Sequence, residues 1–373
     1  MRPGRVPVMD IISILQDAVA LGASDIHLVV GLPPMVRVTG QLVPLESCAA
    51  LSAIDTRNLV YALLREEQMK QFEQDLELDC SHTEPGLARF RINVLANNNG
   101  VGAVLRVIGA RIPSVEEVGL TPAMTALCDL PRGLVLVTGP TGSGKSTSLA
   151  AMVGSINARY RYHILTIEDP IEFVYEPMYS VITQREVGQQ THSFAAALRA
   201  AMRQDPDVIL VGEMRDLETI SLALTAAETG HLVFATLHTT DATQTIDRIV
   251  DVFPPFQQQQ IRVQLAGVLK GVICQTLLPR LDGLGRVAAR ELLLTNSAVA
   301  NLIREGKTHQ IYNAVDTGGR QGMISMDKAL AQLVSGNVVR LEEALPKAHD
   351  ADLFKRYLEG SDVRSLSGSA AWR

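Results

Sequence analysis

Residues 133–147 read Gly-Leu-Val-Leu-Val-Thr-Gly-Pro-Thr-Gly-Ser-Gly-Lys-Ser-Thr and constrain the fold more than any other stretch of the chain. Residues 134–137 form a short apolar run typical of a buried parallel strand, and residues 149–156 are compatible with a helix. Between them, starting at Gly139, lies Gly-x-x-x-x-Gly-Lys-Ser, the Walker A pattern. A strand, a glycine-rich loop and a helix in this order predict a site for the phosphates of a nucleotide.

The loop residues have complementary tasks. Glycines let the backbone curl so that its N–H groups point at a polyphosphate, and the helix that follows adds unpaired N–H groups and its positive dipole end. Lys145 can reach the β- and γ-phosphates, the Ser146 hydroxyl can bind Mg²⁺ and Thr147 can support the α-phosphate. The residues expected to bind the nucleotide are Gly139, Pro140, Thr141, Gly142, Ser143, Gly144, Lys145, Ser146 and Thr147.

Length and composition narrow the class of protein. A chain of 373 residues predicts two or three domains, and its net charge of −6 argues against a broad basic surface for nucleic acid. No apolar run approaches the roughly 18–20 residues that span a bilayer, and no apolar segment follows Arg2 and Arg5 as in a secretory signal. The four cysteines are scattered without a Cys-x-x-Cys pair, which is typical of reduced thiols. We therefore expect a cytoplasmic protein with no transmembrane segment.

Residues 9–112 predict a small mixed α/β domain. The pattern indicates a helix at 10–20, a strand at 26–30, a hairpin at 35–38 and 41–45, a polar helix at 53–76, and two strands at 88–95 and 102–108 around an Asn-Asn-Asn-Gly turn. Pro113 and the acidic residues after it mark a linker. We expect residues 1–8 to be a disordered extension.

From residue 113 to residue 359 the pattern changes to alternating strands and helices, which is typical of a parallel sheet. Apolar strands are expected at 134–137, 164–167, 208–211 and 232–237. Each is followed by residues whose side chains or backbone could bind a ligand or take part in catalysis. In open parallel sheets, ligands bind outside the carboxyl ends of the strands. Beyond residue 250 we expect mostly helix, and at 360–373 a disordered tail rich in Ser and Gly.

Acidic residues follow two of these strands. Residues 208–213 have the form of a Walker B strand, which places Glu213 near the metal, either as a direct ligand or through water; the alternative is a cap on the next helix. Residues 168–172 read Glu-Asp-Pro-Ile-Glu, and Pro170 forbids a regular helix there. We expect Glu172 to be the base that activates water, and Glu168 or Asp169 to be structural or near the metal.

Two histidines flank the strand at 232–237. An extended strand separates His231 from His238 by about 23 Å at about 3.3 Å per residue, so they cannot share a metal ion. His238, at the carboxyl end, is expected to sense the γ-phosphate, whereas His231 is either functional or a hydrogen-bonded structural residue.

Arginines gather on one face of the first domain. Residues 89–94 alternate strictly, which places Arg89 and Arg91 on one strand face, and Arg106 lies on the expected partner strand. This face is either simply solvated or provides arginines to a nucleotide held by the other domain. Arg199 and Arg203, four residues apart on an Ala-rich helix, are second candidates for that role.

With these residues identified, the chain resembles the PilT family, the type IV pilus retraction ATPases among the secretion and pilus motors. The markers are Gly-Ala-Ser-Asp-Ile-His-Leu at 22–28, Gly-Leu-Pro-Pro at 31–34, the Walker A loop, Thr-Ile-Glu-Asp-Pro-Ile-Glu-Phe at 166–173, Gly-Glu-Met-Arg-Asp at 212–216 and Thr-Gly-His-Leu-Val-Phe-Ala-Thr-Leu-His-Thr at 229–239. The last three resemble the family's Asp box, Walker B motif and His box.

The resemblance implies a PAS-like N-terminal domain, a RecA-like P-loop ATPase core and a homohexameric ring that hydrolyses ATP. It supports Glu172 as general base and favours a role for Arg89, Arg91 and Arg106 as contacts of the nucleotide. It also implies an inner-membrane pilus platform protein as partner, and a cytoplasmic position peripheral to that membrane at the pilus base. Whether a paralogous retraction ATPase acts beside it is left open.

One departure from the family pattern concerns residues 298–305, where Ala300 replaces an arginine and puts the efficiency of retraction in question. The nearest alternative is a pilus assembly or type II secretion ATPase, but such proteins carry a Cys-x-x-Cys module that is missing here. A regulator that binds ATP without hydrolysing it is disfavoured by Lys145, Glu172 and Glu213.

Overall fold

The computed structural model describes residues 10–38, 40–108 and 111–365, and the chain divides into two compact units. Unit 1 extends to Arg111 and also includes the short segment Pro170–Val174; unit 2 comprises Ile112–Asp169 and Tyr175–Arg373. The sequence patterns did not predict that Pro170–Val174, which follows a strand of unit 2 in the chain, belongs by its contacts to unit 1. The expectations for residues 1–8 lie outside the described residues.

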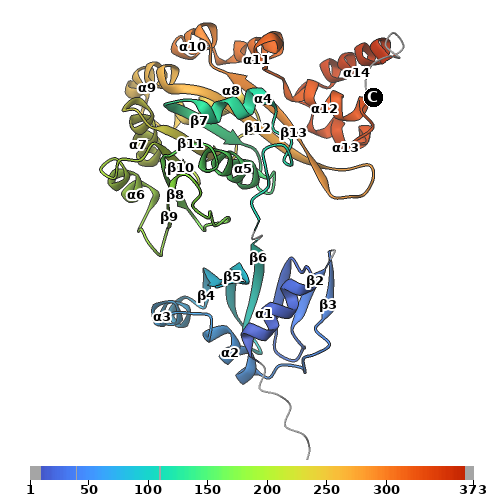
Figure 1. Ribbon diagram of the computed structural model, residues 1–373. Helices are drawn as coiled ribbons and strands as arrows, with labels where there is room; N and C mark the ends of the chain where they lie inside the picture. The colour runs from blue at the N-terminus through green and yellow to red at the C-terminus, as the bar shows by residue number, and fades with distance from the viewer. Residues whose placement is uncertain (1–9, 39, 109–110, 366–373) are drawn as a thin grey trace, which may run out of the picture. The chain divides into compact units, whose positions relative to one another are not determined.

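Unit 1 is built on a six-stranded antiparallel sheet in the order β3-β2-β1-β6-β5-β4 (Figure 1). Its strands are β1 Asp25–Leu28, β2 Met35–Val38, β3 Gln41–Pro44, β4 Glu77–Glu84, β5 Ala88–Asn97 and β6 Gly100–Ile108, and its helices are α1 Ile11–Ala20, α2 Ala53–Tyr61 and α3 Glu66–Asp75. The expected helix at 10–20 and the hairpins are confirmed, whereas β4 was not predicted. The PAS-like class of this unit stays a prediction.

The single helix expected at 53–76 is wrong, because the chain leaves helical geometry after α2 and starts α3 anew. The adjacent residues Leu63 and Leu64 lie in this break, and both are buried. From this break both side chains join the apolar core of unit 1.

Unit 2 is built on a seven-stranded sheet in the order β13-β12-β7-β11-β10-β8-β9 (Figure 1). Its strands are β7 Gly133–Thr138, β8 His163–Glu168, β9 Val181–Glu186, β10 Val208–Val211, β11 Leu232–Leu237, β12 Leu269–Pro279 and β13 Arg286–Leu294. The pairs from β12 to β9 are parallel and only β12–β13 is antiparallel. The four strands expected from the sequence are confirmed, as is a mostly parallel sheet.

Helices complete unit 2, and α6 to α14 share one apolar core with the sheet. The helices of unit 2 are α4 Pro122–Thr125, α5 Lys145–Asn157, α6 Phe194–Ala201, α7 Leu217–Glu228, α8 Ala242–Asp251, α9 Pro255–Val268, α10 Ser297–Arg304, α11 Ile311–Thr317, α12 Met326–Ser335, α13 Leu341–Ala344 and α14 Ala351–Ser365, with short 3-10 turns η1 Ala126–Asp129, η2 Thr308–Gln310, η3 Gly318–Gln321 and η4 Leu345–Lys347. Within the described ranges, none of these helices is both long and apolar enough to cross a membrane.

Beyond residue 250 the described chain is mostly helical, as expected, but it also contains the hairpin β12–β13, which was not predicted. The long apolar run of β12 fits a buried strand as well as a buried helix. Helix α14 continues past residue 359 to Ser365, so residues 360–365 are helical where we expected a disordered tail. Residues 366–373 lie outside the part that the structure describes.

Glu291 on β13 is a buried acid that joins the sheet to two helices. Its Oε1 accepts a hydrogen bond from the N–H of Ala242 at 2.8 Å and its Oε2 one from the N–H of Met326 at 3.3 Å, at the starts of α8 and α12. Burial raises the pKa of Glu291 from 4.5 to about 7, although these two hydrogen bonds oppose the shift. The folded state therefore holds a proton that the unfolded state releases at lower pH.

This shift predicts that the contribution of Glu291 to stability falls as pH rises from about 4.5 to about 7, by on the order of 3 kcal/mol in total. Glu291→Gln cannot titrate and keeps one acceptor. The measurement is the free energy of unfolding in urea at pH 5 and pH 8. The loss of unfolding free energy between pH 5 and pH 8 should be smaller in the variant than in the wild type. Equal losses in the two proteins would contradict the raised pKa.

Candidate functional site

The carboxyl ends of four neighbouring strands meet at one edge of the sheet in unit 2. In the order β7, β11, β10, β8 all three pairs are parallel, so the residues that follow these strands lie side by side. They are the phosphate loop after β7, His238 after β11, Glu213 after β10 and Glu168 at the end of β8. The sequence analysis expected each of these ends to bear functional residues, and the topology makes them neighbours.

The phosphate loop joins β7 to α5 through backbone conformations that require glycine. Gly139, Gly142 and Gly144 have φ angles of 142°, 78° and 85°, in the region that other residues rarely adopt. A Cβ atom on Gly139 would lie 2.2 Å from the carbonyl oxygen of Gln275 on β12, so this glycine is also required by close packing. The glycines of the pattern therefore shape the loop, as expected.

The donors of the loop suit a bound polyanion. Nζ of Lys145 donates to the carbonyl oxygens of Gly139 at 2.7 Å and Pro140 at 3.1 Å, so the ammonium group lies against the loop itself. Oγ of Ser143 is buried and has no hydrogen-bond partner among the described residues. Ser146 and Thr147, both partly buried, follow Lys145 in the first turn of α5. A cation, a buried hydroxyl without a partner and a helix N-terminus at one loop fit the phosphates of a nucleotide.

Glu213 and His238 are in direct contact. Nε2 of His238 lies 3.0 Å from Oε1 of Glu213, and Nε of Arg215 lies 2.6 Å from the same oxygen. Burial alone would raise the pKa of Glu213, but the hydrogen bond from Arg215 and the charge of His238 outweigh it, so the pKa is lowered. An ionised carboxylate at this strand end is suited to a metal ion or its water ligand. The sequence analysis did not single out Arg215, although it lies inside the quoted Gly-Glu-Met-Arg-Asp motif.

The acids of residues 168–172 have different environments. Glu168 is buried and accepts hydrogen bonds from Oγ1 of Thr166 at 2.7 Å and Nε2 of Gln184 at 3.3 Å, which indicates the structural role left open for it. Asp169 and Glu172 are exposed, and no helix forms after Asp169, as Pro170 predicts. Glu172 lies in the segment that belongs to unit 1. Its role as base stays a prediction.

His231 and Arg199, two further candidates from the sequence, form contacts with other parts of unit 2. His231 follows α7, and its Nδ1 contacts the carbonyl oxygen of Ala226 in the last turn of that helix at 2.8 Å, which indicates the structural alternative for this histidine. Arg199 on α6 forms an ion pair with Glu218.

The arginine face of unit 1 has the expected alternation on β5, where Phe90, Ile92 and Val94 are buried. Arg89, on the other face, donates to Oγ1 of Thr83 at 2.9 Å, Oγ of Ser81 at 2.6 Å and, through Nε, the carbonyl oxygen of Ile171 at 3.2 Å. It therefore holds the backbone beside Glu172 within unit 1.

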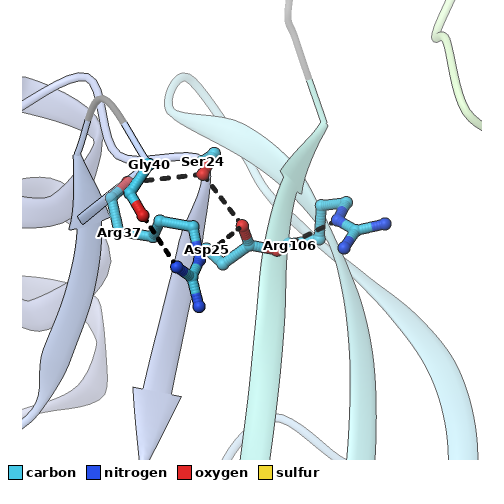
Figure 2. A network of polar contacts seen from close by, with 5 residues as sticks. All are labelled: Ser24, Asp25, Arg37, Gly40 and Arg106. Carbon is cyan, nitrogen blue, oxygen red and sulfur yellow. Dashed lines mark hydrogen bonds and ion pairs between the residues drawn. The ribbon is translucent and has the colours of Figure 1, made fainter. Parts of the chain in front are cut away.

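Arg106 is held by a carboxylate that the sequence analysis left unassigned. On β1, Asp25 pairs across the sheet with Arg37 of β2 and Arg106 of β6, and Arg106 pairs in turn with Arg91 of β5. Figure 2 shows Asp25 between Arg37 and Arg106, with Nε of Arg106 3.0 Å from Oδ1 and Nε of Arg37 3.8 Å from Oδ2.

Asp25 is suited to this position because it stays ionised. Burial alone would raise its pKa, but the hydrogen bond from Ser24 and the bond and charge of Arg106 outweigh this, so the pKa is lowered. The side chain of Arg106 remains 69% exposed, so its guanidinium is anchored but accessible. This network gives Ser24 and Asp25, both within the motif at 22–28, a structural role in anchoring Arg106.

Two residues of the hairpin that lie behind the phosphate loop were not predicted, and one of them, Gln275, donates a hydrogen bond to the loop. Gln275 on β12 and Arg290 on β13 lie in register with each other and close to the start of α5. They were missed because the hairpin itself was not predicted.

The packing of the loop predicts different costs for two alanine substitutions. Gly139→Ala should destabilise the protein strongly, because its Cβ would overlap a backbone oxygen that cannot move aside. Gly142→Ala meets no atom within 4 Å and should cost only about 1–2 kcal/mol for its positive φ. Chemical denaturation of both variants measures the difference, and equal costs would contradict the tight contact between the loop and β12.

Known proteins match nearly the whole chain. A family model described as type II/IV secretion system protein matches residues 4–357. The type IV pilus retraction ATPase PilT of Pseudomonas aeruginosa is 51% identical over 91% of this chain and 98% of its own. A twitching motility protein of Neisseria gonorrhoeae is 50% identical over 86% of this chain and 85% of its own.

The fold agrees as well. A crystal structure of the pilus retraction motor PilT with bound ADP shares 48% sequence identity, covers 93% of this chain and 99% of that one, and superposes with a TM-score of 0.88. A match of this extent includes both units and the phosphate loop. The chain therefore belongs to the type II/IV secretion system protein family and, within it, to the pilus retraction ATPases of the PilT family.

Proposed function

We propose that this chain is a motor that hydrolyses ATP with Mg²⁺ to retract type IV pili, and so to drive twitching motility. The observation that carries the proposal is the edge of the sheet where the phosphate loop, His238 and Glu213 follow adjacent parallel strands. Relatives that match nearly the whole chain bear the names of pilus retraction and twitching proteins, and a structural neighbour holds ADP.

Different residues of unit 2 would contact the phosphates and the metal ion. The loop N–H groups and Lys145 would hold the β- and γ-phosphates, with Ser146 and Glu213 on the side of the metal. When bound, Mg²⁺ neutralises charge on the phosphates. His238 is in contact with Glu213, so a change at the γ-phosphate would reach both side chains together. In this proposal Glu172 accepts the proton of the attacking water.

The assembly and partners are part of the same proposal. Arg89, Arg91 and Arg106 are proposed to stabilise the charge of a nucleotide within a homohexameric ring, and the ring to act on an inner-membrane platform protein from the cytoplasmic side. Two observations support the arginine role: Arg89 is fixed by three hydrogen bonds, and Arg106 is anchored by Asp25 while exposed. Ala300, buried in α10 where the family pattern has arginine, leaves the efficiency of retraction to be measured.

Lys145→Ala should reduce ATP hydrolysis to background, because the loop loses the cation that reaches the phosphates. The measurement is phosphate release by the purified protein. Lys355→Ala, which removes an exposed lysine on α14, is the matched control and should hydrolyse ATP at the wild-type rate. Normal turnover by the Lys145 variant would refute the site. A wild type that binds ATP but releases no phosphate would instead identify a regulator.

Glu172→Gln should still bind ATP but hydrolyse it at least about 10²-fold more slowly, because the amide cannot accept the proton from water. Glu176→Gln removes an exposed carboxylate four residues further along the chain and serves as the control. Binding is measured by calorimetry and turnover by phosphate release. If the Glu172 variant kept full turnover, the base would be another acid, with Asp169 the next to test.

The direction of the motor needs a cellular measurement. Cells that lack the gene, or carry only the Lys145→Ala form, should lose twitching and display excess surface pili, because pili are assembled but not withdrawn. Loss of surface pili would favour the alternative, an assembly ATPase.

A further inference from the structure

A buried polar cluster lies directly behind the phosphate loop. It consists of Gln275 on β12, Arg290 on β13 and Ser148 on α5, of which Gln275 is only 1% exposed. The antiparallel register of the hairpin places Gln275 opposite Arg290. The hairpin thus brings an amide and a guanidinium to the loop from strands that the nucleotide-binding pattern does not include.

The donors and acceptors of this cluster allow only one arrangement. Arginine can only donate, and Arg290 donates from Nε to Oε1 of Gln275 and from Nη2 to Oγ of Ser148, both at 3.2 Å. The Ser148 hydroxyl, having accepted that bond, donates to the same Oε1 at 2.8 Å. The amide oxygen of Gln275 therefore faces Arg290, and its Nε2 is left to donate to the carbonyl oxygen of Ser143 at 2.7 Å.

This last hydrogen bond fixes one peptide of the phosphate loop. In a trans peptide the C=O and the following N–H point in opposite directions. Because the Ser143 carbonyl is held toward Gln275, the N–H of Gly144 must point away from β12. Glycine allows the close contact, since a Cβ on Gly144 would lie 3.3 Å from Nε2 of Gln275.

Arg290 is costly to bury, because its charge has no acidic partner among the residues that the structure describes. In the described parts of the chain no carboxylate lies within ion-pair distance of its guanidinium, and its remaining hydrogen bond goes to the carbonyl oxygen of Gly119 at 3.1 Å. A buried cation without an acidic partner destabilises a fold. Burial lowers the pKa of Arg290 to about 10, so it still carries its charge at neutral pH. A group with this cost indicates a task beyond packing.

We propose that Gln275 and Arg290 are positioning residues for the nucleotide: together they orient the Ser143–Gly144 peptide so that the Gly144 N–H faces the phosphates. The inference rests on the proposed function, because it assumes that the loop binds a nucleotide. It adds the β12–β13 hairpin to the binding site. Neither residue touches the reacting atoms; Gln275 acts through the loop backbone, and Arg290 acts through Gln275 and Ser148.

Gln275→Glu separates this role from a purely structural one. The carboxylate can still accept from Arg290 and Ser148, and it neutralises Arg290, but it cannot donate to the Ser143 carbonyl. We expect the dissociation constant for ADP with Mg²⁺, measured by calorimetry on the full chain, to rise about tenfold or more. The melting temperature without nucleotide should stay at or above the wild-type value.

Two further variants keep the test decisive. Leu293→Ala, a fully buried residue on the opposite face of β13 from Arg290, should lower the melting temperature and leave the ADP affinity unchanged. Arg290→Met removes the group that orients Gln275 and should weaken ADP binding in the same direction as Gln275→Glu. If Gln275→Glu does not fold, Arg290→Met takes its place.

The outcomes distinguish this inference from the proposed function. Wild-type ADP affinity in Gln275→Glu, or in Arg290→Met when the first variant does not fold, overturns the positioning role while leaving the nucleotide site intact. A loss of affinity in Leu293→Ala that matches its loss of stability also overturns the positioning role. If the wild type itself binds no ADP, the proposed function fails, and this inference fails with it.

Discussion

The parallel pairing of β7, β11, β10 and β8 is the constraint on which the rest of the structure depends. The carboxyl ends of parallel strands lie at the same edge of a sheet, so the pairing brings together the phosphate loop, Glu213 and His238. About a hundred residues of chain separate Gly139 from His238. A fifth strand, β12, also positions the phosphate loop, because its backbone lies against Gly139. Only a residue without a Cβ lets the loop lie so close. A change in the register of any of these pairs would separate the groups that must act on one nucleotide.

Arginines are held differently in the two units. In unit 1 the buried carboxylate of Asp25 forms ion pairs with Arg106 and Arg37, so Arg106 is anchored and stays accessible to solvent. In unit 2 the partners of the buried Arg290 guanidinium among the described residues are all neutral, namely Gln275, Ser148 and the Gly119 carbonyl. The first arrangement fixes a cation and neutralises it, whereas the second keeps a cation uncompensated behind a loop whose expected ligand is an anion.

The sequence predicted most of the site because its signals are local. The apolar strand, the glycines and Lys145 lie within fifteen residues, and the residues after the other strands are recognisable by their chemistry. What was missed depends on contacts far apart in the chain. The run from Leu269 to Leu278 has no alternation that distinguishes a buried strand from a helix, so the hairpin, and with it Gln275 and Arg290, was not foreseen. The break between α2 and α3, and the membership of Pro170–Val174 in unit 1, likewise follow from tertiary packing rather than local pattern.

Hydrogen–deuterium exchange with and without ADP and Mg²⁺ tests the central claim most directly, because it reports on the backbone N–H groups that are held to receive the phosphates. The account predicts that the amides of residues 139–147 become strongly protected when ADP is bound, and that the amides at the N-terminal ends of the same strands, such as those of His231 and Leu232, change little. Unchanged exchange at residues 139–147, in a protein that binds ADP, would place the nucleotide elsewhere and contradict the account.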